Sequence, residues 1–258
     1  MTSLKGKLAL ITGASSGIGL ACAYRLAAEQ CDLLLWARRG DLLADAGRDI
    51  GERHRVRVLT DVVDVRDRAA VERAAGARLA SGLVPDIVLN NAGLAAGLAK
   101  LQEGDPDDWD RMVDTNVKGL LYVTRAFLPA MIKRDSGHVV NLGSLAGHQV
   151  YPMGNVYNAS KMAVKALTDA LSMDLLGTRL RVSSVDPGHV VTEFAQVRFA
   201  GDTDRAAKVY EGFAPLEPED VADVVAWVVS RPPNVNILDV VMMSTAQRSV
   251  HHVHRSSS

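Results

Sequence analysis

Cysteine is scarce in this sequence of 258 residues, which contains only Cys22 and Cys31. Neither has a second cysteine or a histidine at the spacing of metal ligands, so the sequence offers no zinc motif and no disulfide framework. Cys22 falls within a predicted helix and Cys31 at the start of a predicted strand. We therefore expect two buried thiols in a reducing compartment and no bound metal.

An excess of one charge and long apolar runs are also absent. The net charge is −1, which argues against the basic face of a nucleic-acid binder. No apolar run is long enough to cross a bilayer, and the N-terminal run "LALIT" is too short for a signal peptide. We expect a soluble, cytoplasmic protein. The tail "HHVHRSSS" holds three of the seven histidines, and a solvated terminal segment is favoured there over a metal site.

What the sequence does contain is a regular alternation of segments. Apolar runs of strand length occupy residues 8–12, 31–37, 55–65, 86–93, 137–144, 180–188 and 236–244. Helical periodicity covers residues 18–29, 41–52, 67–81, 107–133, 155–176 and 218–230. This order predicts an α/β fold, with one Rossmann-type doubly wound domain over residues 1–245 and a tail over 246–258. The parallel sheet has about seven strands, with helices on both faces.

A glycine-rich turn, "TGASSGIG" over residues 12–19, follows the first strand and opens the first helix. Glycines there let the backbone approach a ligand, and exposed N–H groups at a helix N-terminus attract a pyrophosphate. A tight turn that serves packing alone is the structural alternative. The position directly after the first strand favours nucleotide binding, with these candidate contacts: Gly13, Ser15, Ser16, Gly17, Ile18 and Gly19.

The end of the second strand indicates which nucleotide. A site for NAD usually has an acid there, whereas this sequence has Ala37 followed by Arg38 and Arg39. Guanidinium groups match a 2′-phosphate, so NADP is favoured over NAD, with two solvated loop arginines as the alternative. Asp64 and Val65, after the third strand, are candidates to hold the adenine, although Asp64 could equally cap the next helix.

Six motifs then occur in a familiar order. They are "TGASSGIG", "NNAG" at 90–93, Asn116 in "DTNVKG", Ser144 after "VVNLG", "YNASK" at 157–161 and "DPG" at 186–188. In order and spacing they resemble the short-chain dehydrogenase/reductase family, over about residues 5–245. The stretches "NNAGLAAG", "GNVYNASK", "TEFAQVRFAGD" and "NVNILDVVMM" are similar to its NADP-dependent 3-hydroxy acid dehydrogenases, a branch that includes serine and allo-threonine dehydrogenases.

The resemblance implies four catalytic residues: Asn116, Ser144, Tyr157 and Lys161. Tyr157 and Lys161 are four residues apart and share one helix face, where an ammonium would lower the pKa of the phenol. Tyr157 would act as general acid and base, Ser144 would bind the substrate oxygen, and Asn116 would hold a water that relays protons through Lys161. Each residue alone has an ordinary structural explanation, such as core packing, a cap or a bond to its own backbone.

The remaining cofactor contacts follow the fourth and sixth strands. Asn91 and Gly93 should lie beside the cofactor. Pro187, Gly188 and Thr192 should lie near the nicotinamide, where Thr192 either binds its carboxamide or caps a helix.

The substrate side is less defined by the sequence. Residues 189–216 lack a clean period and are expected to form a lid. Within it, Arg198 is a candidate anchor for a substrate carboxylate, or else an ion-pair partner of Asp202 or Asp204. The pocket entrance is assigned to His148, Gln149 and Tyr151, and His189 to either the lining or the surface.

We therefore expect a dehydrogenase for a short 3-hydroxy acid. The alternatives are a reductase of 3-oxoacyl thioesters or bulky ketones, and a non-catalytic nucleotide-binding relative. Apolar residues on several faces of 107–133 and 155–176, together with the resemblance, suggest a homotetramer or homodimer, with deep burial in one subunit as the other explanation.

Overall fold

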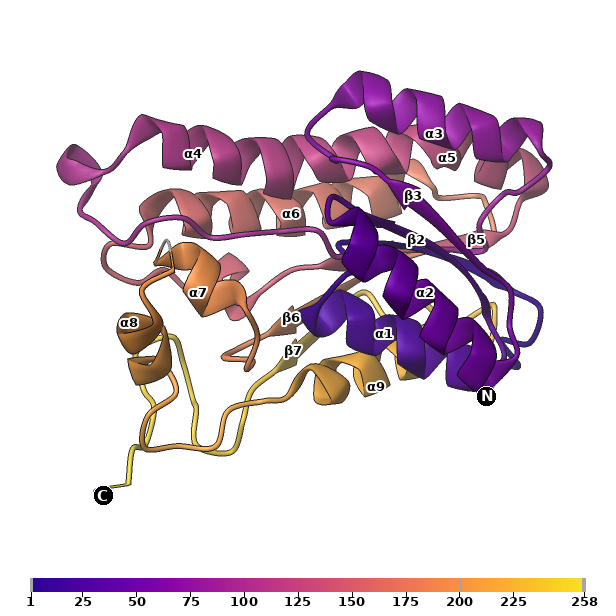
Figure 1. Cartoon of the computed structure of the whole chain (residues 1–258). Coiled ribbons are helices and arrows are strands. Elements are labelled where there is room, and N and C mark those ends of the chain that lie inside the picture. The colour runs from indigo at the N-terminus through magenta and orange to yellow at the C-terminus, as the bar shows by residue number, and fades with distance from the viewer. Residues whose placement is uncertain (1, 200, 257–258) are drawn as a thin grey trace.

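The computed structural model describes residues 2–199 and 201–256, and its centre is one parallel sheet. The strand order is β3-β2-β1-β4-β5-β6-β7, and every neighbouring pair is parallel (Figure 1). The strands are β1 Leu8–Thr12, β2 Asp32–Ala37, β3 Val58–Val62, β4 Ile87–Asn90, β5 Gly137–Leu142, β6 Leu180–Pro187 and β7 Asp239–Met242. The predicted seven-stranded, doubly wound fold is confirmed.

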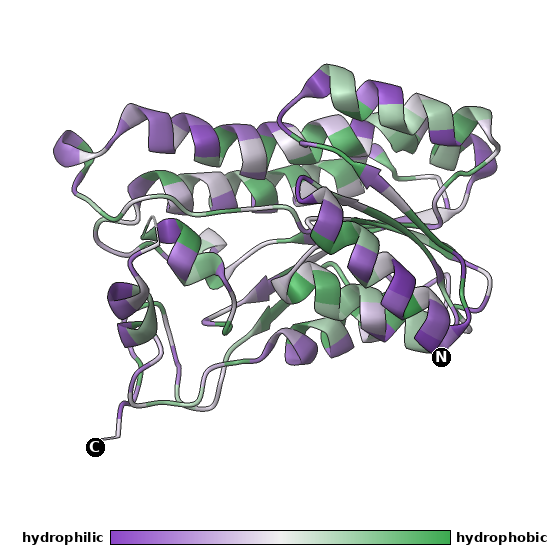
Figure 2. Cartoon of the chain, in the orientation of Figure 1, coloured by the Kyte–Doolittle hydropathy of each residue, from purple (hydrophilic) through white to green (hydrophobic). Residues whose placement is uncertain are grey.

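Helices cover both faces of the sheet because its central strands are apolar on both sides. Along β1, Ala9 and Ile11 pack into the cluster formed with α1 (Gly17–Ala28), α2 (Gly40–His54) and α9 (Pro218–Val229). Leu8 and Leu10 point the opposite way, into the cluster formed with α3 (Arg68–Ala80) and α5 (Leu120–Arg134). Figure 2 shows the green, apolar side of these helices turned toward the sheet.

The long helix predicted over residues 107–133 is interrupted. α4 (Pro106–Val113) and α5 are joined by a π-helical turn, η2 (Asp114–Gly119), which contains Asn116. A π turn fits an extra residue into the helix and changes where its side chains point. The apolar periodicity of the sequence continues through this turn, so it does not reveal the interruption. The helix predicted at 155–176 is confirmed as α6 (Asn155–Asp174).

The predicted lid contains two short helices that the sequence pattern did not predict, α7 (Phe194–Arg198) and α8 (Thr203–Lys208). Both are too short to display a period. Residue 200 of the lid, like residue 1 and tail residues 257 and 258, lies outside the described residues.

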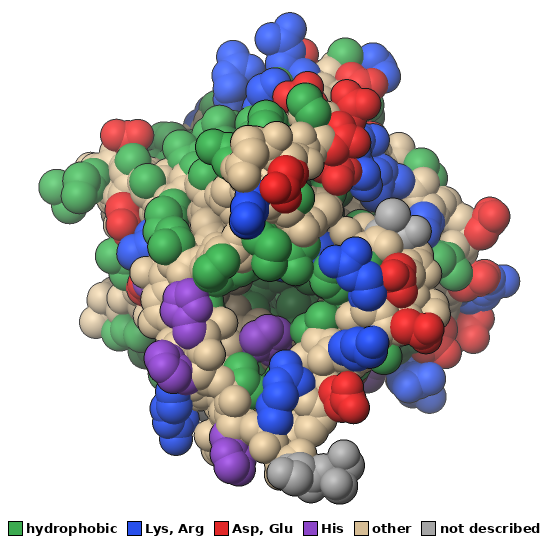
Figure 3. Space-filling view, turned by 90° about the vertical axis from the view of Figure 1, so that its left-hand side faces the viewer, with side chains coloured by type: hydrophobic (Ala, Val, Ile, Leu, Met, Phe, Trp, Pro, Cys, Tyr) green, Lys and Arg blue, Asp and Glu red, His purple; other side chains and the backbone are tan. Residues whose placement is uncertain are grey.

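The C-terminal tail folds back onto the lid. Gln247 and Val253 form an isolated bridge, and the Arg255 guanidinium donates to the backbone oxygens of Val209 and Glu211. The tail histidines are exposed as expected, but this bridge and these hydrogen bonds hold the backbone around them in place. Figure 3 views this side of the molecule, where histidine and other basic side chains surround a hollow with apolar side chains at its floor.

Both thiols are free and buried, and burial raises the pKa of Cys22 and of Cys31 to about 12. Across residues 2–199 and 201–256, no helix is both long and apolar enough to cross a membrane.

Candidate active site

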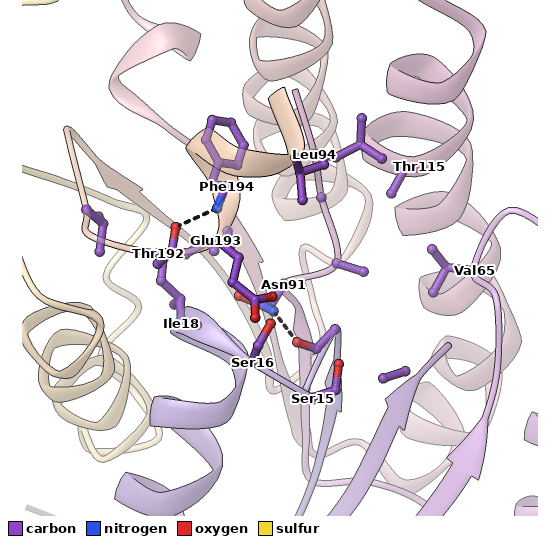
Figure 4. Close-up of a pocket in the computed structure, with 18 of the residues that line it drawn as sticks. Ser15, Ser16, Ile18, Val65, Asn91, Leu94, Thr115, Thr192, Glu193 and Phe194 are labelled. Atoms are coloured by element: carbon purple, nitrogen blue, oxygen red, sulfur yellow. Dashed lines mark hydrogen bonds between the residues drawn. The ribbon is translucent and has the colours of Figure 1, made fainter. Parts of the chain in front are cut away.

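A cavity of about 340 Å³ opens at the carboxyl ends of the strands, where ligands bind in sheets of this kind (Figure 4). Most of the predicted site residues line it: Gly13, Ser15, Ser16, Gly17, Ile18, Arg38, Arg39, Asp64, Val65, Asn91, Gly93, Ser144, Tyr157, Lys161, Pro187, Gly188 and Thr192. Gly19, Asn116 and Arg198 do not line this cavity. Sequence reasoning missed several further lining residues, among them Leu94, Thr115, Glu193, Phe194 and Val197, although all five lie inside the stretches that carry the resemblance.

The glycine turn is shaped for close approach. Gly13 and Gly17 adopt positive φ angles of 68° and 53°, which residues with a side chain rarely adopt. Gly19 packs behind the turn, where a Cβ atom would lie 2.4 Å from Asn91 Nδ2 and 2.5 Å from the Gly13 oxygen. Its contribution is therefore to let helix α1 pack closely, without lining the cavity itself.

Asn91 fastens the end of β4 to this turn. Its Nδ2 donates to the Thr12 oxygen at 2.8 Å and to the Gly13 oxygen at 3.3 Å, and its backbone N–H donates to Thr12 Oγ1. The turn is thereby held from two strands at once.

Arg39 connects three parts of the cavity wall. Its guanidinium donates to the hydroxyls of Ser15 and Ser16, and its Nη1 lies 2.9 Å from Glu193 Oε2, just before α7. Arg38 is exposed beside it and helps to lower the pKa of Asp64. The alternative of two purely solvated arginines does not describe Arg39.

Asp64 is not the cap of the following helix. The cap of α3 is Asp67, whose carboxylate accepts the Ala70 N–H. Asp64 instead lines the cavity and holds Arg66 with a 2.6 Å ion pair.

Asn116 lies behind the cavity and is fully engaged with protein groups. Its Oδ1 accepts the Leu94 N–H at 2.9 Å, while Nδ2 donates to the Leu94 oxygen at 2.8 Å and to Ser160 Oγ at 3.0 Å. Ser160 Oγ in turn donates to the Tyr157 oxygen. Asn116 thus joins η2, the loop after β4 and helix α6, and it does not bond its own backbone.

Tyr157, Ser144 and Lys161 meet at the cavity wall. Burial raises the pKa of Tyr157 above its ordinary value and the Tyr151 phenol adds to this, while Ser144 and Arg198 lower it. Burial lowers the pKa of Lys161 to about 8, and Asp186 opposes that change. The Lys161 Nζ donates to the Leu142 oxygen at 2.8 Å. The sequence predicts that the Lys161 ammonium lowers the pKa of Tyr157, but the groups that lower it in the structure are Ser144 and Arg198, and burial outweighs both.

Thr192 Oγ1 accepts the Phe194 N–H at 3.2 Å, but the N-cap of α7 is Glu193, so Thr192 is not the N-cap considered as its alternative role. The same residue lines the cavity beside Glu193 and Phe194, as Figure 4 shows. The ring of Phe194 packs edge-on against Tyr157, with centroids 5.5 Å apart.

Arg198 lies on the other side of Tyr157, in a neighbouring cavity of about 170 Å³. Its guanidinium is 5.8 Å from the Tyr157 ring centroid and donates to Tyr151 Oη at 2.9 Å and to the Gly97 oxygen at 3.2 Å. Among the described residues it forms no ion pair with Asp202 or Asp204, and Asp202 instead caps α8. Tyr157 lines both cavities, so it separates Arg198 from the phosphate turn.

The residues assigned to the pocket entrance have other partners. His148 Nε2 lies 2.8 Å from Asp186 Oδ2, Gln149 Oε1 accepts the Val250 N–H of the tail, and Tyr151 accepts from Arg198. His189 packs edge-on against Phe213. None of the four lines the larger cavity.

The cavity fits the predicted dinucleotide. Gly13 and Gly17 line it with positive φ angles, α1 presents its N-terminus, and Ala37 stands where an NAD site has an acid, followed by two arginines. Three side chains that can donate or accept a proton, Ser144, Tyr157 and Lys161, line the same cavity.

Comparison with known proteins agrees with this geometry. A family model described as short chain dehydrogenase matches residues 7–203. The NADP-dependent 3-hydroxy acid dehydrogenase YdfG of Salmonella typhi is 42% identical over 251 residues, which cover 96% of this chain and 100% of that protein. An NADP-dependent 3-hydroxy acid dehydrogenase of Schizosaccharomyces pombe is 38% identical over 259 residues, covering 100% of both. The solved closed form of serine dehydrogenase complexed with NADP+ has a TM-score of 0.90 and 39% identity, covering 96% of this chain and 100% of that one.

Proposed function

Because this chain belongs to the short-chain dehydrogenase/reductase family, we propose that it is an NADP-dependent oxidoreductase that transfers a hydride between the nicotinamide and a short 3-hydroxy acid. The observation that carries the proposal is that Ser144, Tyr157 and Lys161 line the same cavity as Arg38 and Arg39. The names of the relatives and the NADP+ of the serine dehydrogenase structure support the same cofactor here.

The cofactor-binding residues divide by the part of NADP(H) that they would hold. The glycine turn and the N-terminus of α1 would bind the pyrophosphate, Arg38 and Arg39 the 2′-phosphate, and Asp64 and Val65 the adenine. The nicotinamide half would lie among Asn91, Gly93, Pro187, Gly188 and Thr192. When bound, NADP(H) supplies the hydride acceptor for oxidation and the hydride donor for reduction.

Tyr157 moves the proton. In oxidation its phenolate oxygen takes the proton of the substrate hydroxyl, and in reduction its Oη–H returns it. Burial opposes the phenolate, so the residues around it must favour the charged form. Ser144 donates to the oxygen on which charge develops, and the Lys161 ammonium supplies positive charge and would bind the nicotinamide ribose.

Asn116 acts by positioning. Its amide fixes Leu94 and, through Ser160, the backbone of Tyr157, so it holds two walls of the site together. The water-mediated proton relay implied by the resemblance stays a prediction.

Arg198 would bind the substrate carboxylate. It is a cation in a small cavity that adjoins Tyr157, and a guanidinium binds a carboxylate with two parallel hydrogen bonds. A short hydroxy acid would then place its hydroxyl at Tyr157 and its carboxylate at Arg198, beneath the lid formed by residues 189–216.

The wider assignments from the sequence stay proposals. A single sheet supports one catalytic domain over residues 1–245, and two buried thiols fit a cytoplasmic location. Exposed apolar side chains on and after helices α5 and α6 support a homotetramer. They are Leu121, Ile132, Met162, Met173 and Leu176. Light scattering after gel filtration would test this assembly.

The function is tested with the purified protein, NADP(H) and NAD(H), and a panel of short 3-hydroxy and 3-oxo acids, serine, allo-threonine and neutral ketones. We expect turnover of hydroxy acids with NADP, and a loss of roughly a thousandfold or more in kcat in Tyr157→Phe with NADPH binding retained. Turnover of bulky ketones or thioesters alone would favour the reductase alternative. Binding of NADPH without turnover of any compound would favour a non-catalytic relative.

The carboxylate anchor has its own test. Arg198→Ala should raise KM for the hydroxy acid by about tenfold or more and leave a neutral alcohol much less affected. Equal losses of activity on both substrates would instead show that Arg198 serves to hold the lid to the Gly97 oxygen.

A further inference from the structure

A cluster of titratable side chains lies behind the active-site wall, where the carboxyl end of β6 packs beside the segment after β5 and the start of β7. Its members are His148, Asp186 and Asp239, whose nearest polar atoms all lie within 4.8 Å of one another. Asp186 is the buried centre, with 1% of its surface exposed. Its Oδ1 accepts Ser184 Oγ–H at 2.6 Å, and its Oδ2 lies 2.8 Å from His148 Nε2. None of the three lines the cofactor cavity.

The carboxylate of Asp186 packs directly against the backbone that carries the catalytic serine. A Cβ atom at Gly143 would lie only 1.6 Å from Asp186 Oδ1, so the carboxylate occupies the space that any other residue would need there. Gly143 stands between Leu142, whose oxygen accepts from Lys161 Nζ, and Ser144. The Asp186 carboxylate thus packs against a segment that contains both the Leu142 oxygen, which accepts from Lys161 Nζ, and Ser144.

The charge of Asp186 also acts on Lys161. Burial lowers the pKa of Lys161 to about 8, and Asp186 is the group that opposes this. Burial and the Asp239 carboxyl raise the pKa of Asp186 itself, while Ser184 and His148 lower it. The net result is a pKa raised to about 6, so Asp186 is charged at neutral pH and becomes protonated as pH falls through that value.

The other charged groups around the cluster are already matched. Lys165, on α6, lies 3.3 Å from Asp239 and 3.5 Å from Asp169. His148 Nε2 is 3.8 Å from Asp239 Oδ2. With Lys165 on its open side, Asp239 needs no further cation, and Asp186 faces His148, Asp239 and Lys161.

We propose that Asp186, held by His148 and Ser184, is a positioning residue that keeps Lys161 cationic and braces the Leu142–Ser144 backbone. This inference rests on the proposed function, because it gives Asp186 a part in the same reaction. Without a carboxylate here, Lys161 would lose its proton nearer neutral pH and would support the phenolate of Tyr157 over a narrower range.

The test compares Asp186→Asn with Asp239→Asn, which removes a carboxylate from the same cluster that does not act on Lys161 directly. Lysine labelled with 13C at Cε reports the titration of Lys161 by NMR in the protein alone, and the signal is assigned by its loss in Lys161→Met. In Asp186→Asn we expect the Lys161 pKa to fall by about half a unit or more. The alkaline limb of the pH profile of kcat/KM should move by the same amount. In Asp239→Asn both should stay at their wild-type values.

Two results would overturn the inference. One is an unshifted Lys161 titration in Asp186→Asn with a reduced kcat, which would make the residue merely structural. The other is an equal shift in both variants. If Asp186→Asn does not fold, Asp186→Ser removes the same charge with a smaller side chain and is read the same way. Failure of both to fold would assign Asp186 to the stability of the fold.

The experiment separates this inference from the proposed function. The NMR titration needs neither cofactor nor turnover, so it reads the Asp186–Lys161 coupling alone. A wild-type protein that turns over no substrate would contradict the proposed function, whereas an unshifted Lys161 in an active enzyme would contradict only the inference.

Discussion

The cofactor side and the lid side of this molecule are built differently. On the cofactor side, β1 is buried along its whole length and runs directly into the glycine turn and α1. On the lid side, α7 and α8 each contain one buried residue, Ala195 and Ala206. The lid is held by polar contacts that join distant parts of the chain, such as Arg198 to Gly97 and Arg255 to Val209.

This difference indicates where the molecule can move. Regions with few buried apolar contacts open at low free-energy cost, whereas a core strand opens only with the whole fold. A rigid cofactor site beside a loosely held lid suits an enzyme whose substrate must enter and leave while a larger cofactor stays oriented. The ion pair between Arg39 and Glu193 connects the two sides.

Of three substitutions that compare the two sides, Gly19→Ala on the cofactor side is expected to have the largest effect on ligand affinity. In Gly19→Ala the new Cβ would collide with Asn91 Nδ2 and the Gly13 oxygen, so the turn must shift. Overpacking costs roughly 1–3 kcal/mol, and we expect NADPH affinity to fall by up to about a hundredfold. Fluorescence titration of NADPH measures it.

Gly76→Ala is the matched control, because no atom of residues 2–199 or 201–256 lies within 4 Å of a Cβ at Gly76 in α3. It should bind NADPH like the wild type and be slightly more stable. Normal NADPH affinity in Gly19→Ala would show that the turn tolerates displacement, and the rigid description of the cofactor side would fail.

A smaller effect is expected from Arg39→Ala, because Arg39 lies where its ion pair with Glu193 connects the two sides. Loss of the guanidinium should weaken NADP binding by about tenfold and leave NAD binding nearly unchanged, because only NADP carries the 2′-phosphate. Isothermal titration of both cofactors gives the ratio. Glu193→Gln is the control, since it removes the ion-pair partner but keeps the guanidinium, and NADP affinity should be maintained or improved. An equal loss for NADP and NAD would limit Arg39 to supporting Ser15 and Ser16.

The smallest effect is expected on the lid side, from Arg255→Ala. This guanidinium donates to two lid carbonyls and lies 5.0 Å from the Phe213 ring centroid, but the residue is exposed. We expect a loosened lid, with substrate KM raised about two- to fivefold and NADPH affinity unchanged. Arg248 lies in the same tail, and within the part of the chain that the structure describes its side chain bonds only to Gln247, so Arg248→Ala should change neither value. A loss of NADPH affinity in Arg255→Ala would remove the distinction between the two sides.

Most of the cofactor side could be predicted from the sequence because its signals are local. Gly13 and Gly17 lie in one turn, and Arg38 and Arg39 directly follow a buried strand. The substrate side could not be predicted in the same way. The sequence identifies Arg198 as a candidate carboxylate anchor in the lid. Its position over the Tyr157 ring and its hydrogen bond to the Gly97 oxygen join segments far apart in the chain. The π turn at Asn116 left no trace in the apolar pattern.

The alternation of strands and helices, the glycine turn and the one-turn spacing of Tyr157 and Lys161 are legible in the amino-acid sequence, because each depends on residues within a few positions. The charge environment of the site, in contrast, is set by packing between distant segments. Burial acts against the phenolate of Tyr157 and against the ammonium of Lys161, and the carboxylate that supports the lysine arrives from β6 with its histidine from another segment. Burial and electrostatic neighbours are set by how the chain packs, which residue types and spacing do not specify.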